Sequence, residues 1–138
     1  MAEGLTPGLT VTRKLVVDRG RTVAFMGEEC RVYGTPFLIQ DIEGTCRNLI
    51  LEHLEEGQDS VGTNVTLDHV APTMEGTEIE ILVTVDDIDR RAVTFKVTAR
   101  DSVDELAKGK HSRFIVDKEK VAERLAAKAL KLAKAQEV

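Results

Sequence analysis

The sequence predicts a single α+β domain in which one long apolar helix packs against a curved antiparallel β-sheet. A strand-like run precedes a long helical run that begins at Thr35, and further runs with alternating apolar residues follow it. The 138 residues suffice for one domain with a buried core. Because the chain has four Phe, one Tyr and no Trp, that core must be aliphatic.

The composition is typical of a soluble globular protein, with 42% hydrophobic and 31% charged residues. A net charge of −5 argues against a nucleic-acid partner, because binding to the phosphate backbone depends on clustered Lys and Arg. No run of about eighteen apolar residues is present, so we expect no transmembrane helix and no membrane partner. The N-terminal segment lacks the pattern of a signal peptide, which favours a cytoplasmic location.

The two cysteines, Cys30 and Cys46, are isolated in the sequence and lack the spacing of metal ligands. We therefore expect free thiols in a reducing cytoplasm and no metal site. Cysteine is among the residue types most often found in protein interiors, so we expect both side chains to be buried or half-buried.

The segment before the helix predicts an arm, two strands and a connection. Residues 1–8 contain two Gly and one Pro and indicate a loose arm. Residues 9–17 are rich in β-branched side chains and partly alternate, which predicts a strand. Residues 22–26 predict a short second strand, and residues 27–34 an irregular connection with charged side chains.

Thr35-Pro36 predicts a helix start, with Thr35 as the N-cap and Pro36 at the first helical position. The run from Pro36 to about Leu54 has apolar residues around far more than one stripe, so we expect a helix buried on most sides. Gly44 interrupts this helix, at a cost of about 1 kcal/mol relative to Ala. Such a glycine indicates close approach by another backbone, from a strand or from a second subunit.

Four strand-like runs follow the helix, at residues 61–70, 77–88, 91–100 and 107–116. In the second and third of them the apolar residues alternate, which predicts a sheet with one buried and one solvent-exposed face. The polar connection Asp86–Arg91 fits a β-hairpin between these two strands.

Residues 117–138 predict a C-terminal helix with six Lys or Arg, in which Val121, Leu125, Ala129 and Leu132 have helical spacing. A basic helix of this kind can bind a membrane or a partner protein. Its apolar stripe is thin and rich in Ala, so we favour a helix that docks on the domain by one face. Because the chain has no internal repeat and no low-complexity linker, we expect it to form one domain throughout.

Three polar residues are expected where the helix meets the sheet. Thr35 is at the helix N-terminus, where N–H groups and the helix dipole can stabilise an oxyanion. Glu43 follows two turns later among apolar residues, where a carboxylate needs a partner. His69 shares the alternation of Val61 and Thr63 on the apolar face, so its side chain should point inward. A hydroxyl, a carboxylate and an imidazole near a helix N-terminus suit acyl transfer.

Each of these residues also has a purely structural interpretation. Thr35 can act only as a helix cap, Glu43 can lie on a solvent-exposed strip of the helix, and His69 can be a hydrogen-bonded core histidine. Of the other histidines, His53 is expected at the surface and His111 is assigned no role.

Three stretches of the sequence resemble the fluoroacetyl-CoA thioesterase group of the hotdog superfamily. They are TPFLIQDIEGTC (35–46), EEGQDSVGTNVTLDHVAPTMEG (55–76) and VTARDSVDELAKGKHSR (97–113). The middle stretch has the family's Gly-Thr and histidine, and the last has its D-x-V-D-E-L and G-x-H-x-R patterns. The resemblance runs over residues 9–125 and implies the hotdog fold, in which a curved antiparallel sheet wraps a long central helix, here with an extra C-terminal helix.

The resemblance implies hydrolysis of an acyl-CoA to the free acid and CoA. It implies that Thr35, Glu43 and His69 are catalytic, and that Gly62 and Arg113 contact the substrate. A structural ion pair is the alternative role for Arg113. The family also implies a homodimer with the active site close to the dimer interface, and pairing of two such dimers into a tetramer is left open. It uses no metal and no cofactor other than the CoA of the substrate.

The resemblance leaves two mechanisms and two functions open. His69 acts as general base, and Glu43 either orients it or attacks the thioester carbon to give an anhydride. The alternative function is a non-catalytic hotdog module that binds an acyl-CoA or another small ligand. A dehydratase would need a different arrangement of histidine and carboxylate.

The segment before Thr35 departs from the family pattern. In the fluoroacetyl-CoA enzyme this segment is longer and carries phenylalanines that cover the pocket. Here residues 26–34 form a short segment without Phe. We therefore expect a small or medium acyl group, with no prediction of specificity for fluoroacetyl-CoA.

Overall fold

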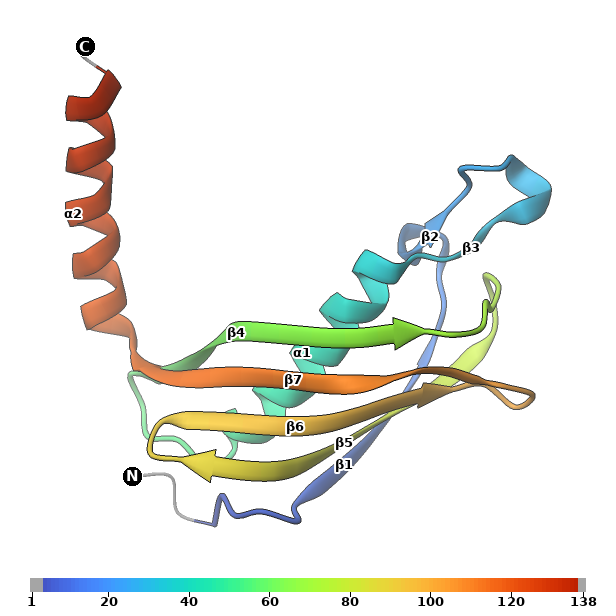
Figure 1. Ribbon diagram of the computed structural model, residues 1–138, viewed down its shortest axis with the longest axis horizontal. Coiled ribbons are helices and arrows are strands. Elements are labelled where there is room, and N and C mark those ends of the chain that lie inside the picture. Colours follow the sequence, from blue (N-terminus) through green and yellow to red (C-terminus); the bar gives the residue numbers. More distant parts are fainter. Residues whose placement is uncertain (1–3, 137–138) are drawn as a thin grey trace.

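The computed structural model describes residues 4–136, which form a five-stranded antiparallel sheet wrapped around one long helix (Figure 1). The strand order is β1-β5-β6-β7-β4, and β2 pairs with β3 in a separate small ladder before the helix. The elements are β1 Thr10–Val16, β2 Thr22–Val23, β3 Val32–Tyr33, α1 Thr35–Leu51, β4 Gln58–His69, β5 Glu78–Asp89, β6 Ala92–Arg100, β7 Glu105–Asp117 and α2 Lys118–Gln136, with 3₁₀ turns at Arg19–Arg21 and Glu28–Cys30.

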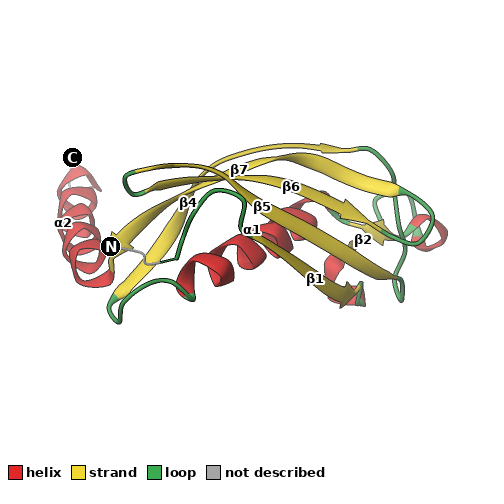
Figure 2. Ribbon diagram, turned by 90° about the horizontal axis from the view of Figure 1, so that it is seen from below, coloured by secondary structure: helices red, strands yellow, loops and turns green. Residues whose placement is uncertain are grey.

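The core lies between α1 and the concave side of the sheet (Figure 2). β5 and β6 turn alternate residues toward the helix, and each is at most 1% exposed: Ile79, Ile81, Val83, Val85, Val93, Phe95, Val97 and Ala99. The predicted period-two pattern of these strands is therefore confirmed. The helix contributes the buried apolar side chains Leu38, Ile42, Cys46, Leu49 and Ile50.

The predicted N-terminal arm is partly ordered on the domain. Residues 1–3 lie outside the described residues. Leu5 is only 8% exposed and belongs to the core. The Gly8 N–H donates to the Val85 carbonyl at 2.8 Å. Residues 4–8 are therefore held against the core and β5, and the prediction of a loose arm is wrong for them.

The start of α1 differs from the prediction in its cap. Gly34 is the N-cap and Thr35 is the first helical residue. The Thr35 hydroxyl bonds His69 and makes no side-chain cap, so the predicted Thr35 cap is wrong. The helix ends at Leu51, because the following N–H groups of His53 and Leu54 close turns onto carbonyls three residues earlier.

The surroundings of α1 agree with the prediction in part. Most residues of this helix are buried or half-buried, and Pro36, Gln40 and Arg47 lie along one exposed strip. A Cβ at Gly44 would lie 3.7 Å from the guanidinium of Arg13. Within the single chain the neighbour of Gly44 is thus a side chain, so the predicted approach of a strand is wrong, whereas the alternative approach of a second subunit stays a prediction.

The β5–β6 hairpin is tighter than the sequence suggested. β5 continues through Asp89, so most of the predicted connection belongs to the strand. The turn consists of Arg90 and Arg91, and Arg90 adopts the left-handed backbone region with φ 59°. The predicted hairpin itself is present.

β4 contains a β-bulge that the alternation of apolar residues did not predict. Its register against β7 shifts between Gly62 and Asn64, which leaves Thr63 without a cross-strand partner. Before the bulge Val61 lies on the solvent side, and after it His69 lies on the helix side. The predicted common face of Val61, Thr63 and His69 is therefore wrong, because the extra residue reverses the alternation. The inward direction predicted for His69 is correct.

α2 projects away from the domain at the end of β7 (Figure 1). None of its described residues is buried, and Leu125 and Leu130 are 63% and 69% exposed. The prediction that this helix docks by one face is wrong, because α2 follows directly on Asp117 of β7 with no turn to bring it back. Within residues 4–136, no helix is long and apolar enough to cross a lipid bilayer.

Removal of α2 is expected to leave the domain almost as stable as before. A chain that ends at Asp117 should keep its Tm within about 3 °C of the full chain, because α2 buries no side chain. Thermal unfolding followed by circular dichroism checks this. A loss of more than about 8 °C would contradict it and would indicate that α2 is covered by another molecule in solution.

Candidate active site

The N-terminus of α1 and the end of β4 bring Thr35 and His69 together. The Oγ1 atom of Thr35 lies 2.7 Å from Nδ1 of His69. Thr35 is the first residue of the helix and His69 is the last of the strand. The structure thus joins two of the three residues that the sequence singled out.

The surroundings of His69 favour its neutral form. Burial lowers the pKa of His69 below its ordinary value of 6.5, because an apolar environment disfavours the imidazolium. Its Nε2 atom is buried and has no hydrogen-bond partner among the described residues. A neutral ring with its proton on Nε2 presents the Nδ1 lone pair to the Thr35 hydroxyl. In that state His69 can accept the hydroxyl proton as a general base.

A hollow of about 440 Å³ opens beside this pair. Its wall is mostly apolar and includes Val23, Phe25 and Val32 from the segment before α1. Phe25 is 92% exposed and lies just before the segment without Phe, so the departure from the family pattern gave it no predicted role. An apolar wall next to a hydroxyl and an imidazole suits a small acyl group.

A buried carboxylate holds the segment that leads into Thr35. Asp41 of α1 is 7% exposed and accepts two hydrogen bonds from the Arg21 guanidinium, at 2.9 and 3.1 Å. The Tyr33 hydroxyl donates to the same carboxylate at 2.5 Å. Burial raises the pKa of Tyr33 well above its ordinary range, so this hydroxyl remains a donor. The members of this network share no sequence motif and meet only in the fold, so the sequence alone does not predict it.

Glu43 forms an ion pair with Arg113 across the helix–sheet interface. Oε2 of Glu43 lies 3.3 Å from Nη1 of Arg113, whose side chain is only 5% exposed. Arg113 also donates to the hydroxyl and the carbonyl of Ser60, at 2.7 and 2.8 Å. Burial lowers the pKa of Arg113, and the Glu43 carboxylate opposes this shift. The structure therefore shows the predicted ion pair of Arg113, and a contact of Arg113 with substrate stays a prediction.

Gly62 lies directly beneath the Glu43 carboxylate. A Cβ at position 62 would lie 2.7 Å from Oε2 of Glu43 and 3.3 Å from Cε1 of His111. Because real Cβ atoms do not come so close to an oxygen, a side chain here would displace the carboxylate. Gly62 thus leaves the space in which Glu43 reaches Arg113.

The three residues that the sequence grouped do not all meet within one chain. Thr35 and Glu43 are eight residues apart on α1, which corresponds to about 12 Å along the helix axis. The Thr35–His69 pair and the Glu43–Arg113 pair are therefore two separate groups of the candidate active site, and each is called a half-site. The sequence places both residues on the helix, and their eight-residue spacing already sets this separation along its axis.

Neither cysteine takes part in the half-sites. Both are free thiols, as predicted. Cys46 is fully buried, and burial raises its pKa to about 12, so the thiol remains protonated. Cys30 is exposed on the 3₁₀ turn before β3, and the prediction that it is at least half-buried is wrong. Within residues 4–136, no group of three His, Cys, Asp or Glu could hold a metal ion.

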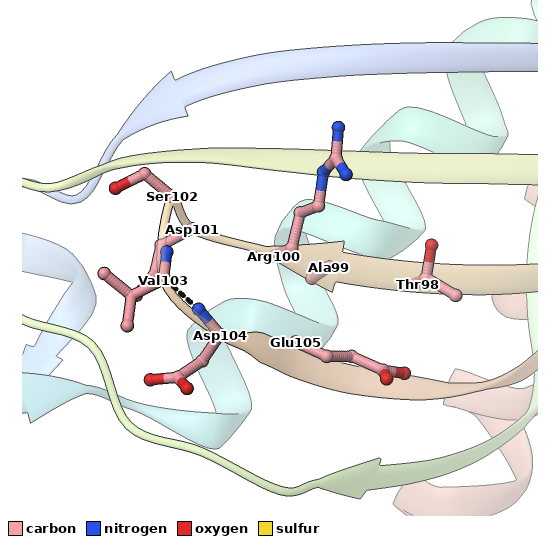
Figure 3. Close-up of a pocket in the computed structure, with 8 residues that line it drawn as sticks. All are labelled: Thr98, Ala99, Arg100, Asp101, Ser102, Val103, Asp104 and Glu105. Carbon is pink, nitrogen blue, oxygen red and sulfur yellow. Dashed lines mark hydrogen bonds between the residues drawn. The ribbon is translucent and has the colours of Figure 1, made fainter.

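A second hollow, of about 510 Å³, lies at the turn between β6 and β7 (Figure 3). The side chains of Arg100, Asp104 and Glu105 point in different directions around it. Oδ1 of Asp101 accepts the N–H groups of Val103 and Asp104 at 2.8 and 2.7 Å, which closes the turn. These bonds also lower the pKa of Asp101. The polar groups here stabilise a turn and do not converge on a common point.

The family model of the fluoroacetyl-CoA-specific thioesterases matches residues 17–119 of this chain. A curated relative, the fluoroacetyl-CoA thioesterase of Streptantibioticus cattleyicolor, is 28% identical over 127 residues. This match covers 87% of the chain and 91% of the relative.

Two solved structures have the same architecture. A fluoroacetyl-CoA thioesterase superposes with a TM-score of 0.84 at 27% identity, over 91% of this chain and 98% of that one. A thioesterase superfamily member from Thermus thermophilus gives a TM-score of 0.84 at 26% identity, over 96% of this chain and 98% of that one. The predicted hotdog fold is confirmed. Because the family model covers well over half of the chain, this protein belongs to the fluoroacetyl-CoA-specific thioesterase family and is a thioester hydrolase.

Proposed function

We propose that this protein hydrolyses a small or medium acyl-CoA to the free acid and CoA, with Thr35, Glu43 and His69 as its reacting groups. The observation that carries the proposal is the 2.7 Å contact between Thr35 and His69 beside an apolar hollow. A variant of a related fluoroacetyl-CoA-specific thioesterase was solved with fluoroacetate and CoA bound, which supports an acyl-CoA as substrate here.

His69 is the general base of the proposed reaction. Its Nδ1 atom takes the proton of the Thr35 hydroxyl, or of a water that this hydroxyl positions, as the oxygen attacks the thioester carbon. The imidazolium then returns the proton to the departing CoA thiolate. Attack by water gives the free acid directly, whereas attack by Thr35 gives an acyl-Thr35 ester, which a water deprotonated by His69 then hydrolyses to the acid and the free hydroxyl. In the alternative route the Glu43 carboxylate attacks first, which gives an anhydride that water hydrolyses.

The N-terminus of α1 provides the oxyanion donor. Pro36 has no N–H, and those of Phe37 and Leu38 both donate to the Gly34 carbonyl at 3.0 Å. Within the first turn we therefore assign the oxyanion to the backbone N–H of Thr35, assisted by the helix dipole. One such donor contributes roughly 3 kcal/mol to stabilisation of the transition state.

We propose further that the active protein is a homodimer in which Glu43 of the partner subunit completes the Thr35–His69 half-site. β4 is a twelve-residue strand at the edge of the sheet, and long open edges are normally covered. Glu43 is 41% exposed beside the open strip of α1. A twofold axis that pairs two such strips brings each carboxylate toward the other chain's helix N-terminus.

Mixing two inactive variants tests this arrangement. Glu43→Ala and His69→Ala proteins are unfolded together, refolded as a mixture and assayed by release of free CoA thiol. If the two residues act across the interface, each mixed dimer has one intact site, and about one quarter of wild-type activity returns. If they act within one chain, the mixture stays inactive, which would overturn the trans arrangement. Activity in either variant alone would remove that residue from the site.

The rate is expected to persist to a lower pH than an unperturbed histidine would allow. His69 acts as a base only when neutral, and burial lowers its pKa below 6.5. The acidic limb of the kcat/KM profile should therefore have its midpoint below 6.5, and it should vanish from the residual activity of His69→Ala. A midpoint above 6.5 would contradict this assignment of the base.

A panel of acyl-CoAs defines the substrate and tests the alternative function. The panel covers short, branched, aromatic and long acyl groups, with thiol release as one measurement and calorimetric binding as the other. The apolar wall at Phe25 favours a small or medium chain. Binding without turnover of any of them would replace hydrolysis by a non-catalytic acyl-CoA-binding role.

A further inference from the structure

His111 is fully buried on β7, on the side of the sheet that faces α1. Its pattern Gly109-x-His111-x-Arg113 puts three alternate residues on that face. The proposed reaction gives His111 no step.

The two ring nitrogens of His111 have different partners. Nδ1 lies 2.9 Å from the carbonyl oxygen of Asn64. A carbonyl only accepts, so Nδ1 carries the proton, and Nε2 then has a free lone pair. That lone pair accepts the Nη1 N–H of Arg113 at 3.2 Å. The same Nη1 donates to Glu43, so His111 and Glu43 share one end of the guanidinium.

This arrangement requires a neutral imidazole. A protonated ring would turn an N–H of Nε2 toward the N–H groups of Arg113. Burial lowers the pKa of His111, with Arg113 acting in the same direction. The charged groups that face the ring are Arg113, from β7, and Glu43, from α1.

The Asn64 carbonyl that His111 binds belongs to the bulge of β4. The register shift lies between Gly62 and Asn64. Gly62 and His69 are seven positions apart, and an odd separation puts two residues on opposite faces of a regular strand. Both nevertheless face α1, because the bulge inserts one residue between them. Without the bulge, one of the two half-sites would lose its strand residue.

We propose that His111 is a positioning residue for the thioesterase reaction: its Nδ1–H braces the bulge that turns both Gly62 and His69 inward, and its Nε2 aims Arg113 at Glu43. This inference rests on the proposed function. In this proposal His111 does not contact the substrate. Loss of its hydrogen bonds lowers kcat because Glu43 and His69 are then misplaced.

Two substitutions separate the functions of the ring nitrogens. His111→Phe keeps the bulk and removes both hydrogen bonds. His111→Asn keeps a donor near the position of Nδ1 and loses the acceptor for Arg113. Val83→Ala, in the core layer of β5, is the control for a loss of stability away from both half-sites.

The kinetic arm compares kcat and KM for one acyl-CoA in all four proteins. His111→Phe should lower kcat about 100-fold, because misplacing a reacting group by about 1 Å costs that much. KM should stay within about threefold, and His111→Asn should lie between His111→Phe and the wild type. Val83→Ala should keep kcat within about twofold. A kcat for His111→Phe within about threefold of the Val83→Ala value would overturn the positioning role.

The second arm does not depend on turnover. Nitrogen-15 NMR of the wild type should show the proton of His111 on Nδ1 between pH 6 and 8, about the ordinary His pKa. Amide hydrogen exchange at residues 62–66 should become faster in His111→Phe and stay closer to wild type in His111→Asn. A proton on Nε2, or unchanged exchange in His111→Phe, would overturn the brace. A wild type without turnover would overturn the proposed function instead, with this arm still deciding the role of His111 in the bulge.

Discussion

Replacement of Glu43 by Gln is expected to lower kcat roughly 1,000-fold, with little change in KM. Gln keeps the size of the side chain and an oxygen that can accept from Arg113. It removes the negative charge that either orients the base or attacks the thioester carbon. The measurement is steady-state release of free CoA, with Glu52→Gln, exposed at the end of α1, as the matched control. A loss of less than about tenfold would exclude Glu43 from both routes.

The same substitution should cost the fold about 1–3 kcal/mol. Arg113 is buried and would keep its bonds to Ser60 but lose its anionic partner. Urea unfolding of the two proteins measures this cost. Because the cost is below the usual stability of a domain, a folded but inactive Glu43→Gln protein is expected. That outcome separates the chemical role of the carboxylate from its structural one.

Replacement of Gly109 by Ala is expected to destabilise the domain by about 3 kcal/mol or more. A Cβ at this position would overlap the carbonyl oxygen of Thr66 and lie 2.9 Å from Cα of Leu67, both in the backbone of β4. A backbone in a sheet cannot move aside as a side-chain tip can, so β4 would have to separate from β7. The loss should appear as a lower urea midpoint.

Gly20→Ala is the control for the Gly109 experiment. A Cβ there would lie 3.5 Å from Oδ1 of Asp18, an ordinary contact with an exposed side chain. Its effect should stay within about 1 kcal/mol of wild type. If Gly109→Ala destabilised the domain as little as Gly20→Ala, by less than about 1 kcal/mol, β4 and β7 would tolerate a side chain at their closest approach.

The sequence predicted those parts of the molecule that depend on local periodicity. The alternation in β5 and β6 identified the buried face of both strands, since each is covered by neighbours on either side. Thr35-Pro36 located the start of α1, although the hydroxyl bonds His69 and leaves the cap to Gly34. The sequence also predicted that Thr35 and His69 lie close together, because each is at the end of a predicted element.

Features that depend on contacts between distant segments could not be predicted in the same way. The bulge in β4 shifts the strand by one residue, and Gly62 is a local signal for a bulge but does not mark Thr63 as the extra residue. The network of Asp41 with Arg21 and Tyr33 joins elements without a common motif. The projection of α2 depends on the absence of a turn after Asp117. The sequence assigns no role to His111, because the Asn64 carbonyl that it binds belongs to another strand.

The bulge makes the length of β4 as important as its composition. Deletion of one residue between Gly62 and His69 would leave every proposed catalytic side chain in the sequence and still turn one half-site out to solvent. Insertion of one residue would have the same effect. The geometry of both half-sites therefore depends on a count of residues in this strand, and a β4 without the bulge would present Gly62 or His69 to the helix, but not both.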